Sequence, residues 1–563
     1  MTQSDVLTLI TFFIVISGGT YILGEYMYAV FSKNNYTWLK IPSIIEIKFY
    51  KIMGINPDEE MNYKEYLSVL LIFNFIGAIV LLFILMAQGI LPFNPQHLAG
   101  VPFWLAFNTT ISFVTNTNWQ AYSGENTLSY LSQFSGLTVH NFLSAATGIT
   151  VLLAFARAFK TKPSHELGNF WVDLTKTLIY LFLPLSIILS IFLISQGVVQ
   201  TFSPYITATT IEGSKQLIPL GPAASQIAIK QLGTNGGGFF GVNSAHPFEN
   251  ATPFSNFLEM ISLLLIPAAL PYTFGRLIGS RRQGMIIWSA MAILLITGLG
   301  IGLWAEYQGN SALSGLPFME GKEVRFGITN SVLWGVSTTA TANGSVNAMH
   351  SSFAPITGMI ATINLMLGEI IYGGVGTGLT GMLMYVILTV FITGLMVGRT
   401  PEYLGKKIEA REIKLAIITI LIPSALILIG SMIASTTQMG LSSLGNKGPH
   451  GLMEILYTYS SCSQNNGSAF GGLNANTAFY NSSLGICMLI GRLVSIIFPL
   501  AIAGNLAQKK YTPPSLGTFP TDNMLFVTLL IGVILIVGGL TFFPALSLGS
   551  IVEHILMQKG ILF

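Results

Sequence analysis

Four runs of threonine, serine, asparagine and glycine recur along the chain, each between a short apolar stretch and a long one. Aligned on one another, they match the pairs Asn118-Trp119, Asn235-Gly236, Asn343-Gly344 and Asn466-Gly467. Uncharged oxygens of this kind suit a large, weakly hydrated monovalent cation, because Ca²⁺ and Mg²⁺ favour carboxylate sites. A single Asn-Gly pair is an ordinary turn, but four matched runs predict a four-fold cation filter.

The expected mechanism is that of a short helix which enters the membrane and stops half-way. Its C-terminal carbonyls carry about half a negative charge, and the following glycines let the backbone turn further carbonyls towards a shared axis. Trp119 stands where the other three runs have glycine, so we expect only pseudo-symmetry. The residues expected to form this cation filter are Thr117, Asn118, Trp119, Gln120, Thr234, Asn235, Gly236, Gly237, Ala342, Asn343, Gly344, Ser345, Asn465, Asn466, Gly467 and Ser468.

The rest of the sequence is typical of a multi-pass membrane protein. Only 9% of the 563 residues are charged and 52% are hydrophobic, whereas soluble domains carry about 25% charged residues. Hydrophobic stretches long enough to span a bilayer occur ten times. They lie near 6–30, 66–88, 138–159, 172–196, 254–276, 284–305, 353–398, 413–436, 481–507 and 523–546.

These spans and the four runs predict an all-α integral membrane protein that forms a single membrane domain over residues 1–563. Each run lies between two spans, so the repeating unit is a span, a re-entrant pore helix and a second span. The expected repeats cover residues 66–159, 172–276, 284–398 and 413–507 around a central pore. The spans at 6–30 and 523–546 are additions at the two ends.

Lysine and arginine are distributed unequally between alternate loops. One set of loops holds 19 of them, the other set holds 6, and Arg492 lies within a span. Because cytoplasmic loops carry the excess of positive charge, this pattern predicts that both termini are exterior.

The seventh hydrophobic stretch is predicted to obstruct the pore on its cytoplasmic side. It is too long for one span, and its glycine-rich run at 372–379 cannot hold a regular helix. Glu369 and Arg492 are ionisable residues within spans, which is costly unless they are functional or paired. We expect them to line the vestibule below the filter and set its field, and a direct pairing between them is a further hypothesis. An alternative is that Arg492 reaches the membrane interface and Glu369 caps the broken helix. The gate candidates are Glu369, Gly373, Gly374, Gly376, Gly378 and Arg492.

The chain resembles the A subunit family of the bacterial Kdp potassium-transporting ATPases. The four runs, at 115–125, 233–241, 340–350 and 465–472, look like the filter loops of that family, and residues 394–405 match a cytoplasmic signature. The resemblance implies a place in the K⁺-transporter superfamily with Trk, Ktr and HKT proteins. It also implies high-affinity, ATP-driven K⁺ uptake across the bacterial cytoplasmic membrane, with K⁺ as the transported ion. The implied partners are a P-type ATPase subunit of Kdp B type and the small Kdp C and Kdp F subunits.

The sequence contains no motif for catalysis. A phosphate-binding Gly-x-x-x-x-Gly-Lys-Ser/Thr loop, an Asp-Lys-Thr-Gly phosphorylation motif and a His-Glu-x-x-His zinc motif are all missing from it. We therefore expect a non-catalytic subunit that binds no nucleotide and no nucleic acid. The alternative is a gradient-driven Trk- or HKT-like K⁺ transporter or channel. The two terminal spans and the residue pattern of the four filter runs disfavour this alternative.

Overall fold

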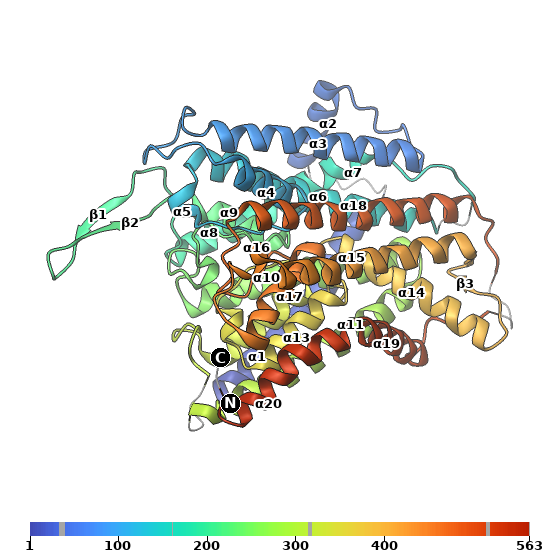
Figure 1. The fold of residues 1–563 in the computed structure, drawn as a ribbon. Helices are drawn as coiled ribbons and strands as arrows, with labels where there is room; N and C mark the ends of the chain where they lie inside the picture. Colours follow the sequence, from blue (N-terminus) through green and yellow to red (C-terminus); the bar gives the residue numbers. More distant parts are fainter. Residues whose placement is uncertain (33–39, 160–161, 314–317, 514–517, 562–563) are drawn as a thin grey trace.

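The computed structural model describes residues 1–32, 40–159, 162–313, 318–513 and 518–561, and it is almost entirely helical (Figure 1). The described residues contain ten helical segments that are long and apolar enough to cross a membrane, which confirms the predicted number. They are α1 (Gln3–Phe31), α3 (Tyr63–Ala87), η1 with α6 (Ser132–Arg157), α7 with η2 and α8 (Phe170–Ser195), α10 (Pro253–Leu277), α11 (Arg281–Tyr307), α14 (Thr377–Met396), α15 (Ala410–Thr436), α18 (Ala478–Gln508) and α19 with η6 and α20 (Met524–Gln558).

Three of these segments change helical type along their length. The π-helical turns η1 (Ser132–Thr138), η2 (Thr177–Phe182) and η6 (Ser547–Ile551) continue into or out of α-helix. The α-helical parts are α6 (Val139–Arg157), α7 (Phe170–Lys176), α8 (Leu183–Ser195), α19 (Met524–Leu546) and α20 (Val552–Gln558). Backbone hydrogen bonds therefore stay within each segment, as a bilayer requires.

Four shorter helices separate pairs of long ones, and we call them the half-helices. They are α4 (Phe103–Val114), α9 (Ala223–Leu232), α12 (Gly327–Ala340) and α17 (Gly448–Ser463). The order long helix, half-helix, long helix thus occurs four times along the chain. At 10 to 16 residues, the four half-helices are too short to cross a bilayer.

Burial separates the long helices into an inner and an outer set. The share of buried residues in the most apolar stretch of each segment is 83% for the segment that contains α6, 78% for α10, 72% for α14 and 56% for α18. The long helices that precede the half-helices are less buried, at 17% for α3, 39% for Phe170–Ser195, 50% for α11 and 28% for α15. The helix that follows each half-helix therefore lies nearer the centre, and the helix before it faces the surroundings. Large apolar side chains on α3, such as Phe75 and Phe83, are exposed, as expected for a lipid-facing surface.

Polar side chains mark where several long helices begin. Asn62 accepts hydrogen bonds from the backbone N–H groups of Lys64 and Glu65 at the start of α3, and Thr252 caps α10 in the same way. Both form capping boxes, which satisfy N–H groups that have no partner within the helix.

The seventh hydrophobic stretch is broken, as predicted, but the break lies earlier than expected. Helix α13 (Pro355–Met366) ends before the glycine-rich run, and α14 begins at Thr377. We call residues 367–376, which join the two helices, the bridging segment. Gly378 was predicted to belong to the break but lies in the first turn of α14, so it is helical.

The remaining elements are short. The strands β1 (Ile206–Thr209) and β2 (Lys215–Ile218) pair antiparallel with Ile206 opposite Ile218, as do β3 (Glu402–Tyr403) and β4 (Lys406–Lys407). The other helices are α2 (Lys40–Met53), α5 (Gly124–Thr127), η3 (Asn243–Ala245), η4 (Ser311–Leu313), η5 (His350–Ser352) and α16 (Gln438–Leu441). Both termini lie at the end of the molecule that carries the β1–β2 hairpin, and β3 lies at the opposite end (Figure 1).

Candidate functional site: a ring of four loops and the adjoining cavity

Each half-helix ends in a loop whose backbone adopts the left-handed conformation. We number the loops in chain order: the first covers residues 115–120, the second 233–238, the third 341–345 and the fourth 464–468. Positive φ angles occur at Asn116 and Asn118, at Thr234 and Gly236, at Gly344, and at Asn465 and Gly467. Glycine and asparagine populate this conformation more readily than most residues, and only Thr234 in this set belongs to neither type.

The four loops contact one another in sequence and close into a ring. A methyl group added at Gly236 would overlap the carbonyl oxygen of Asn343, and one at Gly344 would overlap that of Asn466. One at Gly467 would overlap the carbonyl oxygen of Thr117 in the first loop.

The first and second loops complete the ring through side chains. The Asn116 amide donates to the carbonyl oxygen of Thr234 at 2.9 Å, and Gln120 exchanges two hydrogen bonds with the backbone of Gly238. The filter residues predicted in all four loops are therefore brought together around one centre.

The structure corrects the alignment of the first loop by one residue. The N–H groups of Thr117, Asn235 and Asn466 each donate to the carbonyl five residues earlier in their own half-helix. The carbonyl oxygen of Thr117 also lies against Gly467, in the same way that the carbonyl oxygen of Asn343 lies against Gly236. Thr117, rather than Asn118, is therefore the equivalent of the three asparagines.

This shift removes the exception predicted at Trp119. Asn118 occupies the position of the glycines, with a φ of 54°, which asparagine tolerates better than most residues. Trp119 then corresponds to Gly237, Ser345 and Ser468.

Asparagine side chains join neighbouring loops. The Asn343 amide donates to the carbonyl of Lys230 at 3.0 Å, and the Asn466 amide donates to that of Thr338 at 2.9 Å. In each case the amide of one loop binds the end of the preceding half-helix. The side chain of Asn465 spans from the fourth loop to the Thr117 hydroxyl of the first, at 2.9 Å. These amide groups therefore hold the ring together.

The carbonyl oxygens at the equivalent ring positions are unpaired. Those of Thr117, Asn235, Asn343 and Asn466 accept no hydrogen bond from any described residue. All four residues are buried, although buried carbonyl groups are nearly always paired. The ring thus offers four buried oxygens, one from each loop, and the C-terminal end of a half-helix leads to each.

Aromatic side chains and a neutral histidine support the third and fourth loops. The indole N–H of Trp334 donates to the carbonyl of Ser345 at 2.8 Å, and the Tyr457 hydroxyl lies 2.7 Å from that of Ser468. Tyr457 also contacts Nδ1 of His350 at 2.8 Å. Burial lowers the pKa of His350 to about 3, so this imidazole adds no positive charge near the ring.

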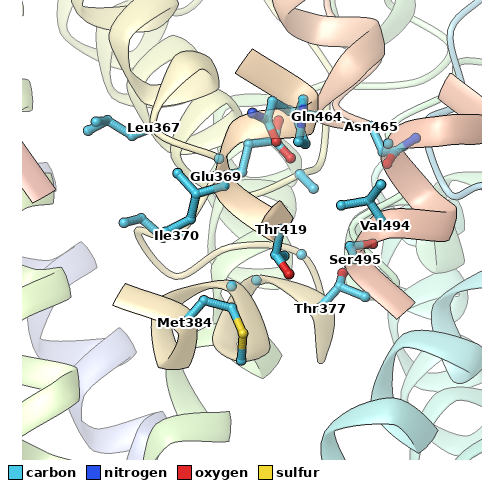
Figure 2. A pocket seen from close by; sticks show the side chains of 18 of the residues that line it. Leu367, Glu369, Ile370, Thr377, Met384, Thr419, Gln464, Asn465, Val494 and Ser495 are labelled. Carbon is cyan, nitrogen blue, oxygen red and sulfur yellow. The ribbon is translucent and has the colours of Figure 1, made fainter. Parts of the chain in front are cut away.

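A cavity of about 70 Å³ adjoins the ring. Its lining includes Asn116 and Asn465 of the ring, Gln464, Glu369 and Arg492, and Figure 2 shows several of these side chains around the shared space. A site of this polarity and size holds several water molecules or a partly hydrated ion, since one water needs roughly 10–15 Å³.

The bridging segment lines this cavity together with the start of α14, and it also touches the ring. The N–H of Val375 donates to the Thr234 hydroxyl at 3.0 Å, and a methyl group at Gly374 would lie 2.8 Å from Cβ of Ala342. Gly376 approaches the carbonyl of Gly148 in α6 so closely that no side chain fits. The predicted gate residues Gly373, Gly374 and Gly376 therefore lie within a tightly packed connection directly beside the ring.

Glu369 and Arg492 line the same cavity but do not form an ion pair. Both oxygens of the buried Glu369 carboxylate lack a hydrogen-bond partner among the described residues. Arg492 donates instead to the carbonyl of Ser144 at 2.8 Å and to the Thr377 hydroxyl at 3.3 Å. The predicted direct contact is therefore not formed.

The two alternatives for these residues also fail. Arg492 is only 6% exposed and does not reach the interface, and the N-cap of α14 is Gly376 without a side-chain cap. Glu369 has a φ of 50°. A strained backbone combined with an unpaired buried carboxylate is typical of functional sites.

The sequence comparisons with known proteins identify one family. Residues 10–555 match the model of the potassium-transporting ATPase A subunit. The chain belongs to that family.

Relatives in the family align along nearly their whole length. A "Potassium-transporting ATPase potassium-binding subunit" from Rhodospirillum centenum is 53% identical, over 100% of this chain and 99% of the relative. Proteins of the same name from Pseudomonas aeruginosa and Methylorubrum extorquens are 52% and 54% identical, with at least 95% of each chain covered. A solved structure, the potassium transporter TrkH from Vibrio parahaemolyticus, gives a TM-score of 0.49 at 14% identity, over 89% of this chain and 98% of that one.

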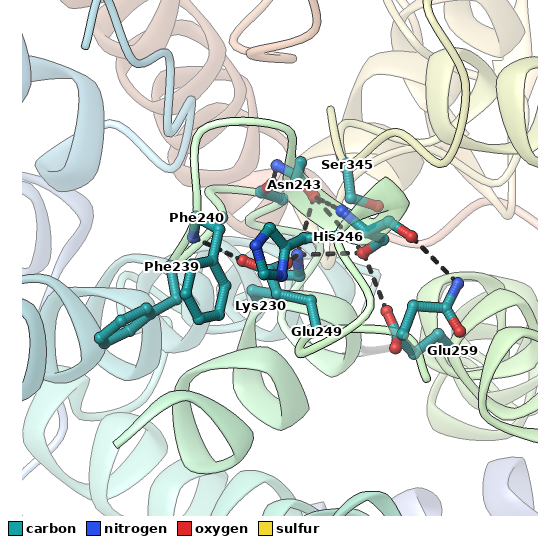
Figure 3. A network of polar contacts seen from close by, with 12 residues as sticks. Lys230, Phe239, Phe240, Asn243, His246, Glu249, Glu259 and Ser345 are labelled. Atoms are coloured by element: carbon teal, nitrogen blue, oxygen red, sulfur yellow. Dashed lines mark hydrogen bonds and ion pairs between the residues drawn. The ribbon is translucent and has the colours of Figure 1, made fainter. Parts of the chain in front are cut away.

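In this member of the family, the sequence did not indicate a buried charged network behind the second loop. Lys230 of α9 forms an ion pair with Glu249 at 2.5 Å, and both side chains are fully buried. A second buried carboxylate, Glu259, accepts hydrogen bonds from Gln231 and Ser244 nearby (Figure 3). Lys230 was counted among the exterior loop cations, and the only signal against that was its position within an apolar helical stretch.

Proposed function

We propose that this chain binds K⁺ in the ring of four loops and delivers it to a partner P-type ATPase subunit for ATP-driven uptake. The observation that carries the proposal is the set of four buried, unpaired carbonyl oxygens at Thr117, Asn235, Asn343 and Asn466. Oxygens in such an arrangement replace the hydration shell of a permeating ion. The name of the relatives, potassium-binding subunit, supports K⁺ as that ion.

The charge distribution favours a monovalent cation at this position. The four loops contain no Asp or Glu, whereas sites for Ca²⁺ and Mg²⁺ depend on carboxylates. Four half-helices end at the ring, and each C-terminus contributes about half a negative charge. Together these partial charges attract a cation without the strong field that would hold a divalent ion permanently.

The cavity and the bridging segment supply the next part of the proposed path. K⁺ that leaves the ring enters the cavity, where the Glu369 carboxylate favours a cation and the Arg492 guanidinium opposes one. The bridging segment blocks onward passage towards the cytoplasm. The ion is thereby held beside the ring until the partner subunit accepts it.

The proposed assembly follows from the family name and from what the chain lacks. An ion filter selects but cannot drive transport uphill, which requires a cycle of differently stabilised states. We propose that the energy comes from a P-type ATPase subunit of Kdp B type, with the small Kdp C and Kdp F subunits completing the complex. This chain is its non-catalytic subunit, formed from four units near 66–159, 172–276, 284–398 and 413–507.

We expect K⁺ binding to be a property of this chain alone and ATP hydrolysis to require the partner subunits. The purified chain should bind K⁺ and show no ATPase activity, and addition of the partner subunits should give ATP hydrolysis stimulated by K⁺. The readout is phosphate release at graded K⁺ concentrations. Hydrolysis by the chain alone, or gradient-driven K⁺ accumulation in liposomes without a partner, would reject the proposal in favour of a Trk- or HKT-like transporter.

We also propose that both termini are exterior in the bacterial cytoplasmic membrane. The termini share one end of the molecule with the β1–β2 hairpin (Figure 1), and most lysine and arginine lies in the loops of the opposite end; Lys33 and Lys160 of that set fall outside the described residues. Fusions after Arg282, Lys406 or Lys510 should report a cytoplasmic position, and fusions after Gly321 or Lys447 an exterior one. A fusion after Lys406 that reports the exterior would mean that α13 and α14 cross the membrane separately, contrary to the four-repeat fold.

A further inference from the structure

One position in the half-helices differs between the second repeat and the other three. It lies five residues before the ring position described above, and it is occupied by Ser112, Lys230, Thr338 and Ser461. The three hydroxyls bind their own loops directly. Ser112 donates to the carbonyl of Trp119 at 2.9 Å, Thr338 contacts the Asn343 side chain at 3.3 Å, and Ser461 accepts from the N–H of Gly467 at 3.0 Å.

Lys230 reaches its loop through a relay instead of a direct contact. Its ammonium group donates to Oδ1 of Asn243 at 2.8 Å, and the amide of Asn243 donates to the carbonyl of Gly236 at 2.8 Å (Figure 3). Two hydrogen bonds thus join a buried positive charge to a carbonyl of the ring. Glu249 completes the arrangement, because one of its oxygens pairs with Lys230 and the other accepts from the N–H of Phe240 at 2.8 Å.

This relay makes the Gly236 carbonyl unlike its three equivalents. The carbonyls of Asn118, Gly344 and Gly467 accept no hydrogen bond from the described part of the chain, whereas that of Gly236 is held by Asn243. A donor whose own acceptor atom is bound to an ammonium group is polarised, so its hydrogen bond is strengthened. The Gly236 carbonyl is therefore fixed in direction, whereas no described residue holds its three equivalents by a hydrogen bond.

A purely structural role does not account for this choice of residues. A buried ion pair is costly to desolvate, and well-packed apolar residues of similar volume often stabilise a fold as well or better. The other three repeats hold the same position with a single hydroxyl. The charged pair instead brings a fixed, directional electrostatic influence to one ring oxygen.

We infer that Lys230 is a positioning residue that sets the affinity and ion ranking of the ring, acting through Asn243 on the carbonyl of Gly236. This inference rests on the proposed function of the ring as a K⁺ filter. It concerns the carbonyl oxygens one residue further along each loop, at Asn118, Gly236, Gly344 and Gly467. The proposed function rests on the four unpaired carbonyls that precede them.

Two variants of the full complex test the inference. Asn243→Gly removes the relay, keeps the Lys230–Glu249 pair, and suits the φ of 54° at that position. The double variant Lys230→Met with Glu249→Gln removes the charges without leaving one unpaired. In K⁺-stimulated ATPase assays, each should raise the half-saturating K⁺ concentration about tenfold, the effect of one hydrogen bond. Each should also reduce the preference for K⁺ over Rb⁺ and NH₄⁺.

A matched control is available in the same chain. Lys322 and Glu306 form another fully buried pair, at 3.1 Å, that contacts Ser352 and Ala354 rather than the ring. The variant Lys322→Met with Glu306→Gln should alter thermal stability but leave the ion ranking at wild-type values. If the Lys230 and Asn243 variants behave like this control, the inference is overturned.

The same experiment separates failure of the inference about Lys230 from failure of the proposal that the ring is a K⁺ filter. Gly236→Ala is included as a reference, because it disturbs the ring itself. A changed ion ranking in Gly236→Ala with unchanged ranking in the two relay variants would overturn only the role of Lys230. Unchanged ranking in Gly236→Ala would overturn the filter. If the double variant fails to assemble, Asn243→Gly alone decides.

Discussion

Replacement of Gly236 by alanine is expected to abolish high-affinity K⁺ binding. The added methyl group would overlap the carbonyl oxygen of Asn343, which is one of the four unpaired ring oxygens. A non-glycine residue at a φ of 83° also adds backbone strain of about 1–3 kcal/mol, which destabilises the loop. Gly344→Ala and Gly467→Ala should act in the same way on the carbonyls of Asn466 and Thr117.

The measurement is K⁺-dependent ATP hydrolysis by the reconstituted complex, together with direct binding of K⁺ to the purified chain. Gly279→Ala is the matched control, because Gly279 has a similar φ of 77° but no atom within 4 Å of the added methyl group. It reproduces the backbone strain without the overlap at the ring. Wild-type K⁺ affinity in folded Gly236→Ala protein would place the binding site elsewhere.

Shortening the bridging segment is expected to convert coupled uptake into a leak. Removal of Gly373 and Gly374 would pull Val375 away from Thr234 and Gly376 away from α6, since both contacts depend on the length of the segment. The cavity beside the ring would then open towards the cytoplasm. K⁺ flux in proteoliposomes without ATP should rise well above the wild-type background.

The control for this deletion is a shortened turn in the β1–β2 hairpin, which projects from the other end of the molecule (Figure 1). That variant should keep flux dependent on ATP, because the hairpin touches neither the ring nor the cavity. Flux that stays strictly ATP-dependent after removal of Gly373 and Gly374 would show that the bridging segment does not block the path.

The membrane-spanning architecture could be predicted because the bilayer leaves the backbone few alternatives. All ten predicted spans correspond to helical segments. The interruption of the seventh was predicted at 372–379, and the observed break covers residues 367–376. Its true position depended on α13 ending at Met366, next to the C-cap Leu367 and Gly368, which has a φ of 92°. The glycine-rich run therefore indicated that a break exists, but a single earlier glycine marks where it begins.

Details of the site were harder to predict because they depend on contacts between distant segments. In the first loop, matching asparagine to asparagine misplaced the register by one residue, since asparagine and glycine both adopt positive φ and Asn118 fills a glycine position. Glu369 and Arg492 line one cavity, but the guanidinium binds the carbonyl of Ser144 in α6 instead of the carboxylate. The burial of Lys230 followed from Glu249 folding back over α9, which no periodicity reveals.

The closure of the ring between its first and last loops has a consequence for biosynthesis. Asn465 binds Thr117 across 348 residues of chain, so the ring cannot be completed until nearly the whole protein has been made. At about 5–20 residues per second, the ribosome needs roughly 17–70 s to cover that interval. During this time the polar end of α4 sits in or near the bilayer without its final neighbours. Nascent chains that stop before the fourth half-helix should therefore be preferred substrates for membrane quality-control proteases.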